Sequence, residues 1–197
     1  MLKKIRSLVL NSSFIEIYDN VLSSEDCDRL ITEFESSRQT PGKTAAGYNP
    51  ERKKSKELVL PRMSDSSVRS SIIFTALDHC INKYKKTYPS LNHLNKFMFE
   101  DVYTFKKFET PEDGFKVWHT EHGPSYHHMV SDRILVWMFY LNDAKSGTEF
   151  MHYPTMSAKK GRCIIWPAAF THVHRSAPNK GVKYIISGWI SYAPEHK

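Results

Sequence analysis

The second half of the chain constrains the fold most, because short apolar segments rich in β-branched and aromatic residues follow one another there. Turn residues, mainly Pro, Gly, Asn and Asp, separate these segments. Many short strands with regular turns are typical of a β-sandwich or barrel. We therefore predict an all-β portion after Pro89, with strands in KFMFEDVYTFKKF, GFKVWHTE, DRILVWMFYLND, TEFMHY, GRCIIWPA, FTHVHR and VKYIISGWISY.

The N-terminal half has a different periodicity. Residues 14–18, FIEIY, alternate between apolar and polar side chains, which predicts a strand. Ser23 and Asp26 offer a capping box for a helix over about 24–37. A second apolar stripe at helical spacing predicts a helix over 64–88. Both helices need a partner for their stripes, so we expect them to pack on one side of an antiparallel double sheet.

A basic segment lies between the two predicted helices. Residues 38–62 contain seven Lys or Arg together with Pro, Gly and Asn. We predict a long loop over about 39–62, and such a loop is either a lid over a binding site or a solvated excursion. As a lid it could close over an acidic peptide.

Length and composition limit the class of protein. A chain of 197 residues fits one domain. The net charge of +7 favours acidic partners, although small soluble proteins are also often basic. Three cysteines without a CxxC motif favour a reducing compartment. No segment has the length of a signal-peptide core or a membrane span, so we expect a cytoplasmic protein without membrane contact.

The stretch VWHTEHG contains two histidines and a glutamate. Side chains at positions i and i+2 of a strand share a face, so His119 and Glu121 can offer two adjacent ligands to a metal. One more histidine would complete the 2-His-1-carboxylate triad of non-haem Fe(II) oxygenases. His172 and His174 are the candidates, and they share a face of the predicted strand, so both could point inward. Alone, the HxE motif is a weak signal.

From Phe105 onward the sequence resembles the prolyl 4-hydroxylase-like branch of the Fe(II)- and 2-oxoglutarate-dependent dioxygenases. The order of the motifs carries the resemblance, and the basic segment lies outside it. The matching stretches are the HTE triplet, RILVWMFYLND, SGTEF, KKGRCIIWPAAFTHVHRSAP, GVKYIISGW and, near the N-terminus, FIEIYDNVLSSEDCDRLITEF.

The resemblance implies a fold and a ligand set. The fold is an α+β double-stranded β-helix, or jelly roll, with N-terminal helices packed on one sheet. The chain would form one domain over 1–197, with the strand, helices and basic loop in 1–90 and the jelly-roll core in 97–193. The iron ligands would be His119, Glu121 and His174. His174 is preferred over His172 because Pro178 follows it by four residues and Lys183 by nine, as in this branch, whereas from His172 the intervals are six and eleven.

The resemblance also implies a 2-oxoglutarate site. Lys183 would pair with the distal carboxylate as a point charge. Tyr140, Ser187 and Trp189 would complete the pocket. Relatives often carry a tyrosine where this chain has Phe108, so that contact is missing or moved to Tyr103.

The implied activity is hydroxylation of an unactivated C–H with release of succinate and CO2. Fe(II) is the metal, 2-oxoglutarate the co-substrate, and ascorbate a candidate reductant. Glu121 replaces the commoner aspartate but keeps the carboxylate that halogenating relatives lack, which favours hydroxylation. A prolyl residue of a peptide or protein is the leading substrate. A nucleobase, a free amino acid or another small molecule remains an alternative, nucleic acid is not favoured, and oligomeric state is open.

A non-catalytic, cupin-like metal-binding jelly roll is the contrasting class, and Lys183 argues against it because a simple metal module needs no cation there. Other polar side chains near the predicted site have simpler interpretations. His122 and Arg133 are expected to be structural. His127 and His128 are expected in a loop beside the mouth, where they could contact substrate.

Overall fold

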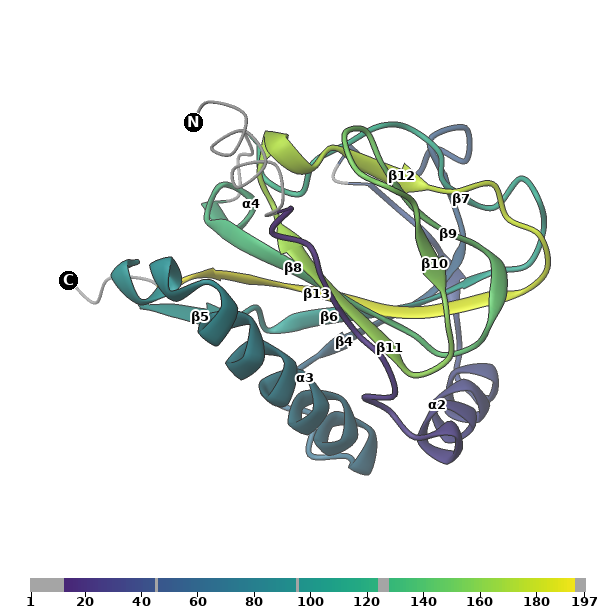
Figure 1. The fold of residues 1–197 in the computed structure, drawn as a ribbon. Helices are drawn as coiled ribbons and strands as arrows, with labels where there is room; N and C mark the ends of the chain where they lie inside the picture. The colour runs from purple at the N-terminus through teal and green to yellow at the C-terminus, as the bar shows by residue number, and fades with distance from the viewer. Residues whose placement is uncertain (1–12, 45, 95, 124–127, 194–197) are drawn as a thin grey trace.

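The computed structural model describes residues 13–44, 46–94, 96–123 and 128–193. Its main feature is an eight-stranded sheet in the order β1-β11-β8-β13-β6-β4-β2, with β5 also pairing with β13 (Figure 1). All neighbours in this sheet are antiparallel. Its strands are β1 (Glu16–Tyr18), β2 (Thr40–Pro41), β4 (Lys56–Pro61), β5 (Phe97–Phe99), β6 (Val102–Phe108), β8 (Arg133–Tyr140), β11 (Arg162–Pro167) and β13 (Lys183–Tyr192).

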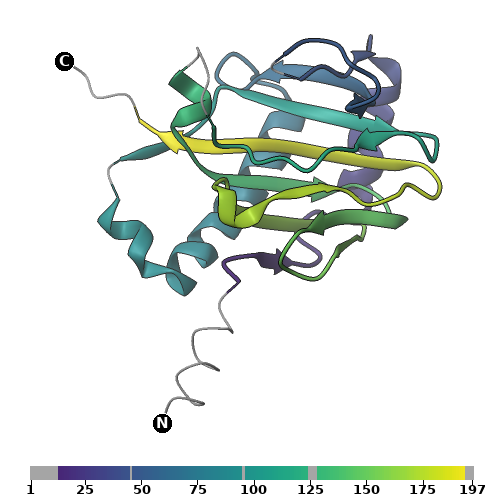
Figure 2. The ribbon, with the colours of Figure 1, turned by 90° about the horizontal axis from the view of Figure 1, so that it is seen from above.

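Shorter strands face this sheet from the other side. One group has the order β10-β9-β12, with β9 (Ala144–Phe150), β10 (Met156–Ala158) and β12 (His174–Ser176). The other is the pair β3 (Lys53–Lys54) and β7 (Gly114–Phe115). Viewed from above, the long β13 crosses the middle of the molecule (Figure 2). The predicted double-stranded β-helix is confirmed, with sheets that do not close into a barrel.

Both predicted helices are present, and they cover the outer face of the large sheet (Figure 1). Helix α2 (Ser24–Ser36) begins as expected, with the Ser23 hydroxyl accepting the Asp26 N–H at 3.0 Å. Helix α3 (Val68–Thr87) begins four residues later than expected. Ser67 caps it by accepting the Ser70 N–H at 3.2 Å, and the Asp65 side chain accepts the Ser67 N–H at 3.0 Å. Ser64, which was the expected start of the helix, lies in a turn that precedes it.

Strict alternation along the central strands separates two apolar cores. In β8, the side chains of Leu135, Trp137 and Phe139 pack under the helices. Val136 and Tyr140 point the other way, into the space between the sheets. The helices thus stabilise one face of the sheet, and the second face is free to carry polar groups.

The predicted loop over 39–62 is partly wrong, because it contains β2, β3 and the six-residue strand β4. Leu58 and Leu60 pack against the helix-side core, while Glu57 is buried on the opposite face. Lys53 neutralises Glu57, with 2.8 Å between its Nζ and the carboxylate. A charged side chain, that of Glu57, thus occupies an inner position of β4 and obscured the alternation of this strand in the sequence.

The remaining short elements are the 3₁₀ helices η1 (Pro89–His93) and η2 (Phe170–His172) and helix α4 (His128–Ser131). Cys27, Cys80 and Cys163 have free thiols buried in the helix-side core. Within the described ranges, no helix is both long and apolar enough to cross a membrane.

Candidate metal centre and co-substrate pocket

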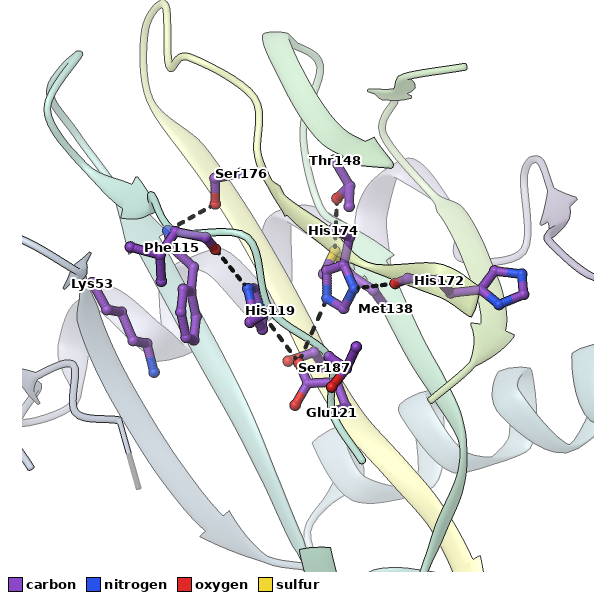
Figure 3. Close-up of polar contacts among 12 residues, drawn as sticks. Lys53, Phe115, His119, Glu121, Met138, Thr148, His172, His174, Ser176 and Ser187 are labelled. Carbon is purple, nitrogen blue, oxygen red and sulfur yellow. Dashed lines mark hydrogen bonds and ion pairs between the residues drawn. The ribbon is translucent and has the colours of Figure 1, made fainter. Parts of the chain in front are cut away.

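His119 and His174 lie opposite each other in an isolated antiparallel bridge between the sheets. The His119 N–H donates to the His174 carbonyl at 3.0 Å, and the His174 N–H donates to the His119 carbonyl at 2.9 Å. The strand predicted over GFKVWHTE is largely absent, since β7 ends at Phe115. This two-residue bridge holds the HTE segment beside the start of β12, although no regular strand continues on the HTE side (Figure 3).

Three side chains converge at this point. The Nε2 atoms of His119 and His174 lie 3.5 Å and 3.6 Å from Oε1 of Glu121. One ligand atom from each residue lies within 4.8 Å of the other two. Two imidazoles and one carboxylate in this arrangement match the donor set of a facial-triad iron site.

The backbone orients both rings for metal binding. The Nδ1 atom of His119 lies 2.9 Å from the Val117 carbonyl, and that of His174 lies 2.9 Å from the His172 carbonyl. A carbonyl only accepts hydrogen bonds, so each Nδ1 carries the proton and each Nε2 presents its lone pair. The residues present therefore fit a divalent metal such as Fe(II).

Burial adjusts the charges of these groups. Burial lowers the pKa of His174, which favours the neutral, ligating imidazole. Burial opposes ionisation of Glu121, but its contacts with the His119 and His174 rings outweigh burial and hold its pKa well below the usual range. Arg133 adds a distant contact, with 3.5 Å from its Nη1 to Oε2 of Glu121. The carboxylate is thus ionised at neutral pH.

His172 lies apart from this cluster, and its ring points away from it in Figure 3. Its Nε2 lies 2.8 Å from the Ser13 carbonyl, and its Nδ1 lies 2.8 Å from the Thr171 hydroxyl. The ring also stacks on Tyr153, at 5.1 Å between centroids. The expectation that both histidines share a face is wrong, because His172 belongs to the 3₁₀ turn η2, where strand alternation does not apply.

A cavity of ≈ 50 Å³, here called the inner cavity, lies beside the three side chains. The Phe115 ring stacks on His119 at 3.6 Å between centroids and closes one side. The residues that line the cavity come from both sheets: Lys53, Lys106, Phe108, Phe115, His119, Glu121, Val136, Met138, Thr148, His174, Arg175, Ser176, Ile185 and Ser187.

The four predicted co-substrate residues lie at different depths. Ser187 lines the inner cavity directly. The Tyr140 hydroxyl is buried behind it, 2.7 Å from the hydroxyl of the lining residue Thr148. Lys183 does not line the cavity: its Nζ donates to the Ser146 hydroxyl at 2.8 Å and to the Gly147 carbonyl at 3.3 Å.

The environments of Lys183 and Trp189 also differ. The Lys183 side chain is 2% exposed and lies over the Phe108 ring, 4.9 Å from its centroid. Burial lowers the pKa of this amine to about 8. Trp189 lies outside the inner cavity, and its ring stacks on the Arg133 guanidinium at 3.6 Å.

A wider cleft of ≈ 760 Å³, here called the outer cleft, is bordered by His119 and Glu121, which also line the inner cavity. Trp189, Arg133 and Val59 lie on its walls. The segment that follows α2, up to and including the start of β4, contributes much of the rest: Thr40, Pro41, Lys43, Thr44, Ala46, Arg52, Lys53 and Glu57. Part of the segment predicted as a loop thus borders the site.

Several other expectations are resolved by contacts. Arg133 forms a core ion pair with Glu100, at 2.9 Å from its Nε, and His122 lies 3.1 Å from the Arg133 carbonyl. The suggested move of a co-substrate contact to Tyr103 is wrong, because its hydroxyl binds Asp65 at 2.7 Å on the helix side of the sheet. The expected substrate contacts of His127 and His128 fall on side chains outside the described residues.

Sequence reasoning missed Lys106, which lines both the inner cavity and the outer cleft. Its Nζ donates to the Ser187 hydroxyl at 2.7 Å, and burial lowers its pKa to about 8. The alternation of YTFKKF was the available signal, because Lys106 and Phe108 share a face and Lys107 takes the other.

Comparisons with known proteins agree with this geometry. A sequence model described as the 2OG-Fe(II) oxygenase superfamily matches residues 104–191. No curated protein matches the chain.

Three similar solved structures share the fold. A collagen prolyl hydroxylase of Paramecium bursaria Chlorella virus-1, solved with 2-oxoglutarate, has a TM-score of 0.67 at 20% identity over 91% of this chain and 97% of its own. A Trichoplax adhaerens prolyl hydroxylase, solved with a peptide fragment of hypoxia inducible factor, has a TM-score of 0.67 at 15% identity over 96% of this chain and 91% of its own. A Pseudomonas putida prolyl-4-hydroxylase has a TM-score of 0.67 at 12% identity over 98% of this chain and 100% of its own.

Proposed function

We propose that the chain is a 2-oxoglutarate-dependent dioxygenase of the 2OG-Fe(II) oxygenase superfamily, and that it hydroxylates a prolyl residue of a peptide or protein. We also propose that His119, Glu121 and His174 bind Fe(II). The convergence of their ligand atoms within 4.8 Å, with both Nε2 atoms left free by backbone hydrogen bonds at Nδ1, is the observation that carries this assignment. The whole of 1–197 would act as one domain, since β4 joins the sheet formed by the 97–193 core.

Bound Fe(II), with 2-oxoglutarate and O2, would supply the oxidative chemistry that inserts one oxygen atom into a C–H bond, while the other oxygen atom enters succinate and CO2 is released. Ascorbate would serve as an accessory reductant. The residues of the chain orient these groups and exclude water. Phe115, Met138 and Ile185 supply apolar walls to the inner cavity, and apolar walls favour a dry site.

Lys183 would hold the distal carboxylate of 2-oxoglutarate. A buried carboxylate needs a cationic, hydrogen-bonded partner. In the described part of the chain, no carboxylate forms an ion pair with Lys183, so its charge is available for a ligand. Tyr140 and Ser187 would add hydroxyl contacts nearer the cavity, and Trp189 would contact the substrate side.

The outer cleft would receive the primary substrate. Its size suits an extended peptide, and Trp189 and Val59 offer apolar contacts. The structurally similar prolyl hydroxylases support a peptidyl proline, and one of them was solved with a peptide fragment. A nucleobase or a free amino acid is the alternative substrate for the same chemistry.

An anaerobic titration with Fe(II) and 2-oxoglutarate tests the assignment of the site. We expect a weak visible charge-transfer band that is lost in His119→Ala and His174→Ala and retained in His172→Ala. Mass spectrometry of proline-containing peptides after aerobic turnover then tests the substrate class, with a gain of one oxygen on proline expected. No band in folded, metal-loaded protein would instead favour a cupin-like binding module.

A further inference from the structure

Lys106 occupies the junction between the two hollows of the site. It lies on the inner face of β6, and its side chain lines both the inner cavity and the outer cleft. Its Nζ donates to the Ser187 hydroxyl at 2.7 Å. Ser187 is followed on the same face of β13 by Trp189, which lines the outer cleft. Lys106 therefore lies nearer the mouth than Lys183, which is two inner-face positions before Ser187.

The other internal basic residues of this region have counter-charges. Lys53 pairs with Glu57 at 2.8 Å, and Arg133 pairs with Glu100 at 2.9 Å. Among the residues that the structure describes, none gives Lys106 a carboxylate within ion-pair distance. An ammonium held between the two sheets without a paired anion is unfavourable, so this charge is more readily explained by an anion that binds with the substrate.

The co-substrate alone does not account for both free lysines. In the function proposed above, one end of 2-oxoglutarate binds the metal and the distal carboxylate binds Lys183. The two lysines occupy different positions in the register, with Lys183 opposite Phe108 and Lys106 opposite Ile185, and their amines bind different hydroxyls, of Ser146 and Ser187 respectively. A second anionic group is therefore expected beside the metal-binding cluster, on the outer side.

We propose that Lys106 is a specificity-determining residue that binds a carboxylate of the primary substrate, held close to the C–H bond that is hydroxylated. This inference rests on the proposed function. Lys43 and Arg52 also line the outer cleft and add positive charge along the approach. A lysine recognises a carboxylate as a point charge, so the isosteric amide should be a much poorer substrate group.

The test uses matched pairs of substrates and matched lysine variants. The probes are proline-containing peptides with Glu or Gln at each flanking position, together with free proline and prolinamide. Lys106→Met is compared with Lys107→Met, because Lys107 is the adjacent residue on the other face and pairs with Glu35 and Glu109 at 2.8 Å. Both variants and the parent are also titrated anaerobically with Fe(II) and 2-oxoglutarate.

The parent is expected to prefer one carboxylate probe over its amide by at least ~10-fold in kcat/KM. Lys106→Met should reduce that preference to within ~2-fold, with the 2-oxoglutarate affinity little changed, and Lys107→Met should keep it. Loss of 2-oxoglutarate affinity in Lys106→Met would overturn the inference and make Lys106 a co-substrate residue. A normal band in the parent without any carboxylate preference would also overturn it. No band in the parent would reject the proposed function itself.

Discussion

Replacement of Lys183 by methionine should stabilise the protein without ligands while abolishing co-substrate binding. The amine has a pKa of about 8 against an ordinary value of 10.5, because burial disfavours its charged form. At 1.36 kcal/mol per pKa unit, the charged amine destabilises the folded state by about 3 kcal/mol at pH 7. Methionine fills a similar volume without that charge.

The partners of the Lys183 amine would not be left without hydrogen bonds. The Ser146 hydroxyl also donates to the Ala177 carbonyl at 3.2 Å, and the Gly147 carbonyl also accepts the Ala177 N–H at 3.0 Å. Removal of the amine therefore leaves no buried polar group unsatisfied at these two atoms. The expected gain in the free energy of unfolding for Lys183→Met is about 2–3 kcal/mol at pH 7.

The pH dependence gives the prediction its sign. Below pH 8 both the folded and the unfolded parent carry the proton on Lys183, so the full penalty is present. Between pH 8 and 10.5 the unfolded chain binds more protons, so this residue raises the stability of the parent as pH rises. The advantage of Lys183→Met should therefore fall by about 2.5 kcal/mol between pH 7 and pH 10, to near zero.

Urea unfolding of the metal-free parent and Lys183→Met at pH 7 and pH 10 measures this difference. Lys180→Met, at an exposed lysine, is the control and should change little. With Fe(II) present in both samples, 2-oxoglutarate at 100 times its Kd for the parent should add about 2.7 kcal/mol to the stability of the parent and nothing to that of the variant. A variant less stable than the parent at pH 7, or an advantage that persists at pH 10, would refute the reasoning.

Three further changes test the site and its support. His174→Ala should weaken Co(II) binding, followed by visible absorption, by more than ~100-fold, and His172→Ala by less than ~10-fold; the reverse order would make His172 the ligand. Glu121→Asp withdraws the carboxylate by one methylene and should weaken Co(II) binding by about 10-fold, so unchanged affinity would contradict a length-matched site. Gly188→Ala would place a Cβ 2.4 Å from Cζ2 of Trp137 and should lower stability by ~1–3 kcal/mol in urea unfolding; an unchanged midpoint would show that the ring can move.

The sequence predicted the parts of the fold that depend on local periodicity. Strands β8 and β13 combine β-branched and aromatic residues with clear turns, and both form as expected. The capping residues of α2 were equally clear. In β4, by contrast, the buried Glu57 forms an ion pair with Lys53 of β3, and two charged residues in a basic segment resemble a solvated loop until the partner strand is known.

The candidate site divides in a similar way. Motif spacing favoured His174 over His172, and the structure places only His174 beside His119 and Glu121. Lys106 was not predicted because the hydrogen-bond partner of its amine, Ser187, lies 81 residues away in the sequence. A lysine in an amphipathic strand normally faces solvent, and only tertiary pairing shows which side of the sheet is covered by helices.

The alternation along β13 means that one strand supplies side chains both to the site and to the apolar core. Lys183 and Ser187 point toward the site, while Tyr184, Ile186 and Ile190 pack under the helices. A shift of one residue would exchange these two sets completely. An insertion or deletion within this strand would therefore remove the chemistry and the folding determinant together. We expect new specificities to arise in this chain by substitution at alternate positions, and changes of length to be tolerated only in the segments that border the outer cleft.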